Sequence, residues 1–243
     1  MIKENRDDFC LLTYYRPGRS RRREIFSADF RLTYKCNQNC VFCAADQRKL
    51  DEPQPDVVRK TLLRTLKKGI QRICFEGGEP TLLPELPEFL HLSKQAGVRD
   101  IVLMTNGMRA ADHGYAKTLS DAGANRVFIS LHAHTSALSE TITATPGSFE
   151  RTVSGIHGFL ATRAHTSLIF VMTSLNMESL PGYLKFVRRE FGRIPVLLSM
   201  ATPYLEPTLY TSLIPKYRDM EPVLKQSARL AAEIGIPLSA MEE

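Results

Sequence analysis

The sequence lacks any long run of apolar residues. Across its 243 residues, no apolar stretch approaches the roughly 18 to 20 residues that a membrane-spanning helix needs. The amino-terminal stretch Met1–Asp8 is charged and lacks the apolar centre of a signal peptide. We therefore expect a cytoplasmic protein without a membrane partner. Hydrophobic residues make up 43% of the chain and charged residues 24%, as is typical of a globular protein with a sizeable core.

Cysteine is also scarce. The chain has five cysteines, an odd and clustered set, which excludes the disulfide framework of a small secreted protein. Cys74, between Ile73 and Phe75, is predicted to be a small core residue, and Cys10 gives no indication of a role. The other three, Cys36, Cys40 and Cys43, fall within eight residues.

The net charge of +6 includes a dense basic run at Arg19, Arg21, Arg22 and Arg23. Such a run suits contact with a phosphate-bearing substrate, a nucleic acid or an acidic electron donor. A solvated basic segment near the terminus is the simpler interpretation. We do not expect a nucleic-acid partner, since no aromatic-interleaved nucleic-acid module accompanies the run.

From the cysteine cluster onward, the pattern alternates strand and helix. Candidate strands are 29–34, 71–76, 99–105, 126–132, 166–173 and 194–200, and candidate helices are 56–68, 84–96, 112–122, 148–162, 179–191 and 218–234. Central strands such as Ile101–Met104 are continuous apolar runs, which favours a parallel sheet buried on both faces.

Six βα units predict an α/β fold, and we favour a partial (β/α)6 barrel with outer helices over a flat doubly wound sheet. Residues 28–235 form the predicted core, residues 1–27 an amino-terminal extension, and residues 236–243 a tail that holds a last short strand or is cut before a further extension. In either architecture the site lies at the carboxyl ends of the strands.

The three clustered cysteines follow the first predicted strand. Thiolates at this spacing can converge on a metal or an iron–sulfur cluster. A structural zinc site needs four ligands, and no second Cys or Cys/His pair follows at the spacing of a zinc finger. We therefore favour a cluster, in which three protein thiolates leave one iron of a four-iron cluster open to a small molecule.

Polar residues also follow the later strands. Glu76–Pro80 contains two glycines, which permit close approach of the backbone to a ligand, and then a carboxylate. Thr105–Gly107 follows the third strand, and Ser130 and His132 are on one face of the fourth. His134, Asn176 and Tyr204 lie in later loops, and their roles stay open.

Together these residues resemble the radical S-adenosylmethionine (SAM) superfamily over roughly residues 28–200. The resemblance rests on Cys36-x3-Cys40-x2-Cys43 with Phe42 before the last cysteine, then Gly77–Pro80, then Ser130–His132. It implies a [4Fe–4S] cluster on Cys36, Cys40 and Cys43, with SAM chelated to the open iron. Its chemistry is reduction of the cluster and cleavage of SAM to a 5′-deoxyadenosyl radical that abstracts hydrogen from the substrate.

The resemblance also implies which residues bind SAM. Gly77, Gly78 and Glu79 hold the methionine amino group, and Phe42 lies near the adenine. Ser130 and His132 match positions that reach the ribose or carboxylate, and Asn106 is a further candidate there. No residue is assigned to catalysis on the substrate. Because cluster potentials extend down to about −700 mV, a low-potential donor such as flavodoxin or ferredoxin is implied.

Some features depart from the family pattern. Glu76 stands where a small residue is common, and it either faces the substrate or, as we favour, pairs with Arg31. No cysteine follows Cys74, so no auxiliary-cluster domain is expected.

The substrate is expected to be a peptide or a small molecule in modification or biosynthesis. A deazapurine-type ring-contracting enzyme, a glycyl-radical activase and a non-enzymatic iron–sulfur protein are the alternatives.

Overall fold

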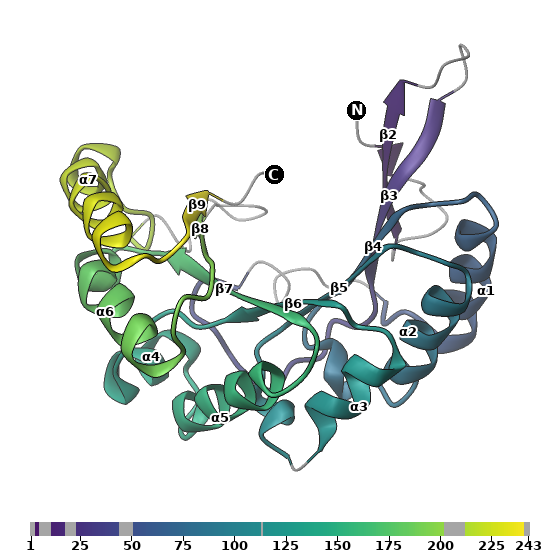
Figure 1. Ribbon diagram of the computed structural model, residues 1–243, viewed down its shortest axis with the longest axis horizontal. Coiled ribbons are helices and arrows are strands. Elements are labelled where there is room, and N and C mark those ends of the chain that lie inside the picture. The colour runs from purple at the N-terminus through teal and green to yellow at the C-terminus, as the bar shows by residue number, and fades with distance from the viewer. Residues whose placement is uncertain are drawn as a thin grey trace.

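The fold is a curved parallel sheet with helices on its outer side (Figure 1). The computed structural model describes residues 3–4, 11–17, 23–43, 51–112, 114–201 and 212–240, with side chains from Ser27 onward. In these ranges, seven strands pair in parallel in chain order: β3 (Arg23–Arg31), β4 (Arg72–Glu76), β5 (Asp100–Thr105), β6 (Arg126–Ser130), β7 (His165–Met172), β8 (Val196–Met200) and β9 (Leu238–Ala240). Two further strands, β1 (Lys3–Glu4) and β2 (Leu11–Pro17), continue the sheet antiparallel beyond β3.

The helices cover the convex side of the arc and leave its concave side without a described helix (Figure 1). They are α1 (Pro55–Leu66), α2 (Leu86–Gln95), α3 (Tyr115–Ala122), α4 (Ser136–Thr143), α5 (Ser148–Leu160), α6 (Leu180–Glu190) and α7 (Tyr217–Ile234), with short 3-10 helices at Pro80–Leu82, Met108–Ala111 and Met177–Ser179. The predicted partial barrel is thus confirmed. No described helix is long and apolar enough to cross a membrane.

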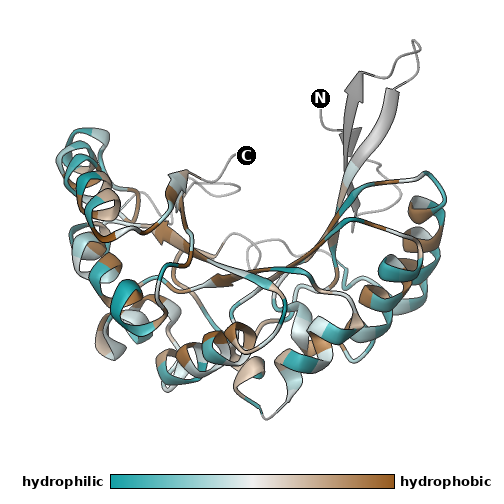
Figure 2. Ribbon diagram, viewed as in Figure 1, coloured by the Kyte–Doolittle hydropathy of each residue, from teal (hydrophilic) through white to brown (hydrophobic). Residues whose placement is uncertain are grey.

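The core lies between the sheet and the helices. Alternation along each strand sends one set of side chains toward the helices, and these apolar residues are almost fully buried: Phe30, Ile73, Phe75, Ile101, Leu103, Val127, Ile129 and Phe170. The apolar strands and the apolar sides of the helices face each other in Figure 2. The alternate residues, among them Arg31, Glu76 and Phe128, therefore face the concave side.

Two predicted elements have boundaries that are wrong by three residues or more. The first strand runs from Arg23 to Arg31, because pairing with β2 on one side and β4 on the other extends it upstream of residue 29. The strand therefore crosses the expected division at residues 27 and 28. The predicted helix 112–122 begins only at Tyr115, because Gly114 adopts a left-handed conformation with φ 79° at its start.

The prediction missed helix α4 and the strands β1 and β2, and it included the last short strand. Helix α4 is absent from the prediction, because its eight residues are short and rich in serine and threonine. The last short strand expected within residues 236–240 is confirmed as β9, which pairs in parallel with β8.

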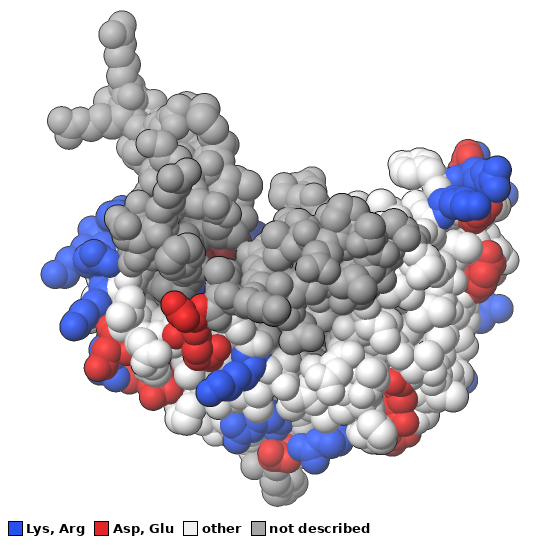
Figure 3. Space-filling view, turned by 180° about the vertical axis from the view of Figure 1, so that it is seen from behind, with Lys and Arg blue, Asp and Glu red and all other residues white. Residues whose placement is uncertain are grey.

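In the face seen in Figure 3, the described Lys and Arg side chains lie beside Asp and Glu and do not gather into one basic patch. The basic run at Arg19–Arg23 lies outside the residues with described side chains.

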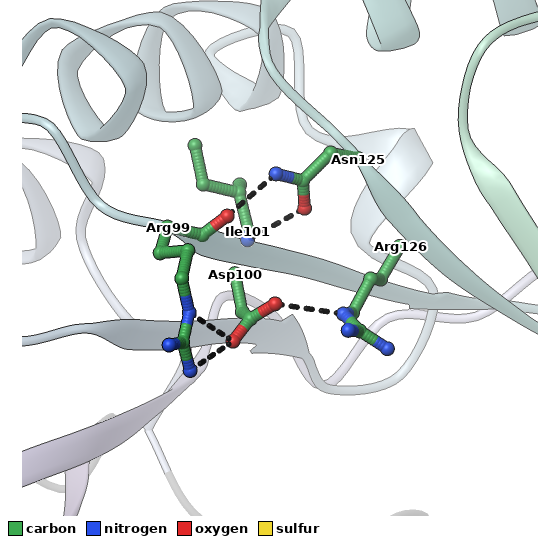
Figure 4. Close-up of polar contacts among 5 residues, drawn as sticks. All are labelled: Arg99, Asp100, Ile101, Asn125 and Arg126. Carbon is green, nitrogen blue, oxygen red and sulfur yellow. Dashed lines mark hydrogen bonds and ion pairs between the residues drawn. The ribbon is translucent and has the colours of Figure 1, made fainter.

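A polar network joins β5 and β6 at their amino-terminal ends (Figure 4). The Asp100 carboxylate accepts hydrogen bonds from Arg126 at 2.8 Å and from Arg99 at 3.1 and 3.2 Å. The Asn125 amide accepts from the Ile101 N–H at 2.9 Å and donates to the Arg99 carbonyl at 2.7 Å. Partial burial acts to raise the pKa of Asp100, but the Arg126 and Arg99 hydrogen bonds hold it below its usual value. The network stabilises the amino-terminal ends of β5 and β6, at the end of the sheet opposite the candidate site.

Replacing Asp100 by Asn should lower the free energy of unfolding by ~1 kcal/mol at neutral pH, since the charge-assisted bonds are lost. The folded-state pKa lies below the unfolded value of about 3.9, so this stabilisation is present above about pH 4 and is lost as pH falls through the folded pKa. Urea denaturation of wild type and Asp100→Asn at decreasing pH checks this. Glu233→Gln, at an exposed position on α7, is the control. A stability difference that does not shrink at acid pH would contradict the assignment.

Candidate active site

The cysteine loop follows β3 directly. Cys36 is exposed, and Cys40 and Cys43 are half-buried. Gln38 lies between them: its N–H donates to the Cys36 sulfur at 3.4 Å, and its side-chain oxygen accepts from the Cys40 thiol at 3.5 Å. The Cys43 N–H donates to the Cys40 carbonyl at 2.9 Å. The loop is therefore a tight turn in which Gln38 contacts the sulfurs of Cys36 and Cys40.

The end of α4 holds this loop in place. The Asn39 N–H donates to the Thr143 carbonyl at 3.0 Å, and the Val41 N–H donates to the Ile142 carbonyl at 2.9 Å. These carbonyls belong to the last turn of a helix, where no intrahelical donor is available. The Asn39 N–H also approaches the Thr145 hydroxyl at 3.3 Å. The unpredicted helix thus fixes the backbone between the first and last cysteines.

The sulfurs suit a cluster better than a single ion. Among the described residues, no group of three His, Cys, Asp or Glu side chains is arranged around one metal ion. The three thiols are nevertheless neighbours: burial, followed by the nearby Cys43 and Cys36 sulfurs, raises the pKa of Cys40 to about 12. A four-iron cluster takes each thiolate at a separate iron, so its ligands need not meet at one point. Binding such a group releases the thiol protons.

The Gly77–Gly78 turn packs on the backbone just before the cysteines. The Gly78 N–H donates to the Thr33 carbonyl at 2.6 Å, and the Glu79 N–H donates to the Lys35 carbonyl at 2.8 Å. A Cβ added to Gly77 would lie 2.4 Å from the Thr33 oxygen, and one added to Gly78 would lie 2.2 Å from the Lys35 oxygen. Both glycines are therefore required by a close approach of backbone to backbone.

Glu79 is fully buried beneath this turn. Its Oε1 accepts from the Thr81 N–H at 3.0 Å, the Thr81 hydroxyl at 2.5 Å and the Thr105 hydroxyl at 2.7 Å. Among the residues that the structure describes, its Oε2 accepts only from the Asn106 N–H, at 2.7 Å. Burial raises the pKa of Glu79, and the hydrogen bonds from Asn106, Thr105 and Thr81 oppose that rise. A carboxylate offers about four acceptor positions, so the remaining capacity is on Oε2.

Asn106 connects the end of β5 to the cysteine loop. Its side-chain N–H donates to the Asn37 side-chain oxygen at 2.7 Å and lies 3.8 Å from the Cys36 sulfur. Its side-chain oxygen accepts from the Met108 N–H at 3.0 Å, and its carbonyl accepts from the Thr152 hydroxyl at 2.9 Å. Asn106 is thus fixed from both sides and touches the loop directly.

His132 lies beside the cysteine loop as well. It is buried, and its Nδ1 accepts from the Val171 N–H at 3.1 Å, which leaves the proton on Nε2. Burial lowers the pKa of His132 to about 4, so the ring is neutral at neutral pH. The Phe42 ring meets it edge-on, with the centroids 5.0 Å apart. Ser130 lies two residues earlier, at the end of β6, and is half-buried.

Three other predicted positions have different outcomes. Asn176 is buried and donates to the His132 and Val171 carbonyls, each at 2.9 Å, so it supports His132. His134 is half-buried against Gly182 of α6. Tyr204 lies outside the described residues. The pairing of Arg31 with Glu76 is confirmed, with Nη2 and Oε1 at 3.3 Å.

Sequence reasoning missed several supporting residues. The Glu52 carboxylate accepts from the Thr33 hydroxyl and from the Tyr34 N–H, at 3.0 Å for the latter. It thereby fixes the segment on which the Gly77–Gly78 turn packs. Thr81 was likewise missed, and Thr105 and Asn37 were recognised only as members of motifs, without their own roles. Thr81 adjoins a recognised motif and Asn37 lies within one, which is a usable signal, whereas Glu52 lies in no periodic pattern.

Comparisons with known proteins agree with this geometry. Residues 30–187 match the family model described as the radical SAM superfamily. A probable GTP 3′,8-cyclase of Metallosphaera sedula is 31% identical over 210 residues, 83% of this chain and 63% of that protein. One of Methanocaldococcus jannaschii is 31% identical over 173 residues, 68% of this chain and 56% of that protein. The chain thus matches less than two thirds of the length of these two relatives.

The fold has solved counterparts as well. The structure of SuiB from Streptococcus suis bound to S-adenosylmethionine superposes with a TM-score of 0.71 at 17% identity. The match covers 88% of this chain and 49% of that one. At this identity the likeness concerns the fold.

Gly78→Ala should disrupt the site because its Cβ would overlap the Lys35 carbonyl. We expect a loss of ~3 kcal/mol in the free energy of unfolding, within the range of severe packing defects, together with reduced iron incorporation. Gly69→Ala is the matched control: its φ is 72° and nothing lies within 4 Å of an added Cβ, so it tests backbone strain alone. That control should cost ~1 kcal/mol and keep full iron content. Urea denaturation and iron assay measure both; equal effects of the two variants would refute the docking role.

Proposed function

The chain belongs to the radical SAM superfamily, whose members use a [4Fe–4S] cluster and SAM, and we propose that it directs this chemistry at a small-molecule substrate. When bound, this cluster would supply the electron for reductive cleavage of SAM to methionine and a 5′-deoxyadenosyl radical, the species that would abstract hydrogen from the substrate. Cys36, Cys40 and Cys43 would hold the cluster and leave one iron for SAM.

One observation carries the proposal. The carboxyl ends of β3, β4 and β5 are joined by direct hydrogen bonds from the cysteine loop through Asn106 to Glu79. The end of β6 reaches the same loop through the contact of His132 with Phe42. A protein that only stores or transfers electrons needs none of these groups around its cysteines.

The side chains have distinct proposed roles. Glu79 Oε2, with acceptor capacity left, would receive the amino group of SAM beside the Gly77 and Gly78 backbone. Phe42 would lie near the adenine, and the His132 Nε2–H would donate to an oxygen of the ribose or carboxylate. Ser130 and Asn106 are the further proposed contacts. In each case the protein supplies position, and a fixed donor or acceptor requires little rearrangement when the ligand arrives.

The proposed substrate is a purine nucleotide. Relatives at 28 to 36% identity are named probable GTP 3′,8-cyclases, which makes GTP the first compound to test. The peptide substrates of the earlier expectation have support only from a likeness in fold. For the electron donor we propose a low-potential flavodoxin or ferredoxin, in keeping with the potentials such clusters reach.

The test is anaerobic reconstitution with iron and sulfide, followed by SAM and dithionite and an assay of 5′-deoxyadenosine. Wild type should release 5′-deoxyadenosine, and Cys40→Ala should lose both the cluster and the product, because a ligand is gone. Cys74→Ala is the control, since that thiol is buried in β4 outside the loop. It should keep both. A fully loaded wild-type cluster that yields no 5′-deoxyadenosine would refute the proposal, and activity in Cys40→Ala would refute the ligand assignment.

A further inference from the structure

A charged pair lies on the concave face of the sheet, next to the Gly77–Gly78 turn. Arg31 and Glu76 are register partners at the ends of β3 and β4. Their neighbours Phe30 and Phe75 belong to the core on the other face, so Arg31 and Glu76 face the side that no described helix covers (Figure 1). Their side chains are 20% and 26% exposed. The pair is therefore open to a ligand within the arc.

The hydrogen-bonding capacity of this pair is not filled. The Arg31 guanidinium has five N–H donors, and among the described residues it donates from Nη2 to Glu76 Oε1, at 3.3 Å. Among the described residues, Arg31 Nε and the Tyr34 hydroxyl are buried without a hydrogen-bond partner. The Arg31 guanidinium lies 6.0 Å from the centre of the Tyr34 ring. A buried donor without a partner destabilises the protein, and an acceptor on a ligand would offset that cost.

The chemistry of the pair selects a class of ligand. Arg31 supplies donors and Glu76 supplies an acceptor side by side, while their charges cancel. A bare phosphate would gain little here, because the Glu76 carboxylate opposes its charge. A neutral group with a carbonyl beside an N–H is complementary to both residues, as when Arg reads the guanine edge and a carboxylate accepts from a base amine.

A flat wall continues the same face. Met104 and Phe128 are register partners on β5 and β6, alternate with core residues and are half-buried. A thioether and an aromatic ring form a surface against which a planar ring can lie. The polar pair and the apolar wall together match a heteroaromatic base.

We propose that Arg31 and Glu76 bind the lactam edge of a purine base, with Arg31 donating to the ring carbonyl oxygen and Glu76 accepting from the adjacent ring N–H. This rests on the proposed function, since it names how the same site would hold its nucleotide substrate. It places the base against the inner face of the sheet, one residue from the turn assigned to SAM.

Anaerobic calorimetry of the SAM-loaded holoenzyme tests this assignment with guanosine, GTP and inorganic triphosphate as separate probes. Wild type should bind guanosine and GTP. Glu76→Gln should weaken guanosine binding about tenfold, which corresponds to the loss of one charged hydrogen bond. The same variant should bind triphosphate more tightly, because the charge of Arg31 is no longer neutralised. Arg31→Lys should also weaken guanosine, since an ammonium lacks the planar fork. Glu221→Gln, in an exposed pair with Lys225 on α7, is the control and should change neither affinity.

Each outcome is decisive. Tighter binding of triphosphate by Glu76→Gln is a gain that a misfolded variant cannot show. Guanosine binding that is absent in wild type, or unchanged in Glu76→Gln and Arg31→Lys, would overturn the assignment. Release of 5′-deoxyadenosine without substrate is measured on the same samples. If that release persists while guanosine fails to bind, the base assignment alone is wrong; if wild type releases none, the proposed function fails.

Discussion

The site depends on one close approach between two stretches of backbone. The Gly77–Gly78 turn lies so near residues 33–35 that any side chain at either glycine would overlap a carbonyl oxygen. Two hydrogen bonds, from the Gly78 and Glu79 N–H groups, join the turn to the segment that leads into the cysteines. The cysteine loop and the proposed SAM-binding turn are therefore parts of one rigid unit.

This approach also determines where the buried carboxylate lies. Burying a carboxylate is costly unless donors satisfy it, and Glu79 is reached by four donors from Thr81, Thr105 and Asn106. Thr105 and Asn106 end the neighbouring strand, so Glu79 ties β4 to β5. Asn106 then passes the constraint on to Asn37 in the cysteine loop. A displacement of the turn would thus move the cysteine loop through two sets of contacts: the backbone hydrogen bonds to residues 33–35, and the bonds from Glu79 through Asn106 to Asn37.

The sequence was sufficient for the residues that carry chemistry and insufficient for those that support them. Cys36, Glu79 and His132 could be found because each follows a predicted strand, and the ends of parallel strands meet at one edge. The roles of α4 and Glu52 could not be found, because their contacts with the loop are long-range and leave no periodic trace. Glu76 was a partial success: its pairing with Arg31 was predicted, whereas its open hydrogen-bonding capacity is visible only in three dimensions.

These contacts imply that the protein orders the cysteine loop and the glycine turn before any cluster is present. Amide hydrogen exchange of the cluster-free protein measures this directly at Asn39, Val41, Gly78 and Glu79, whose N–H groups donate to backbone carbonyls. We expect these four amides to exchange slowly, at rates like those of the neighbouring strands. Exchange as fast as in an unstructured chain until cluster and SAM are added would contradict the account.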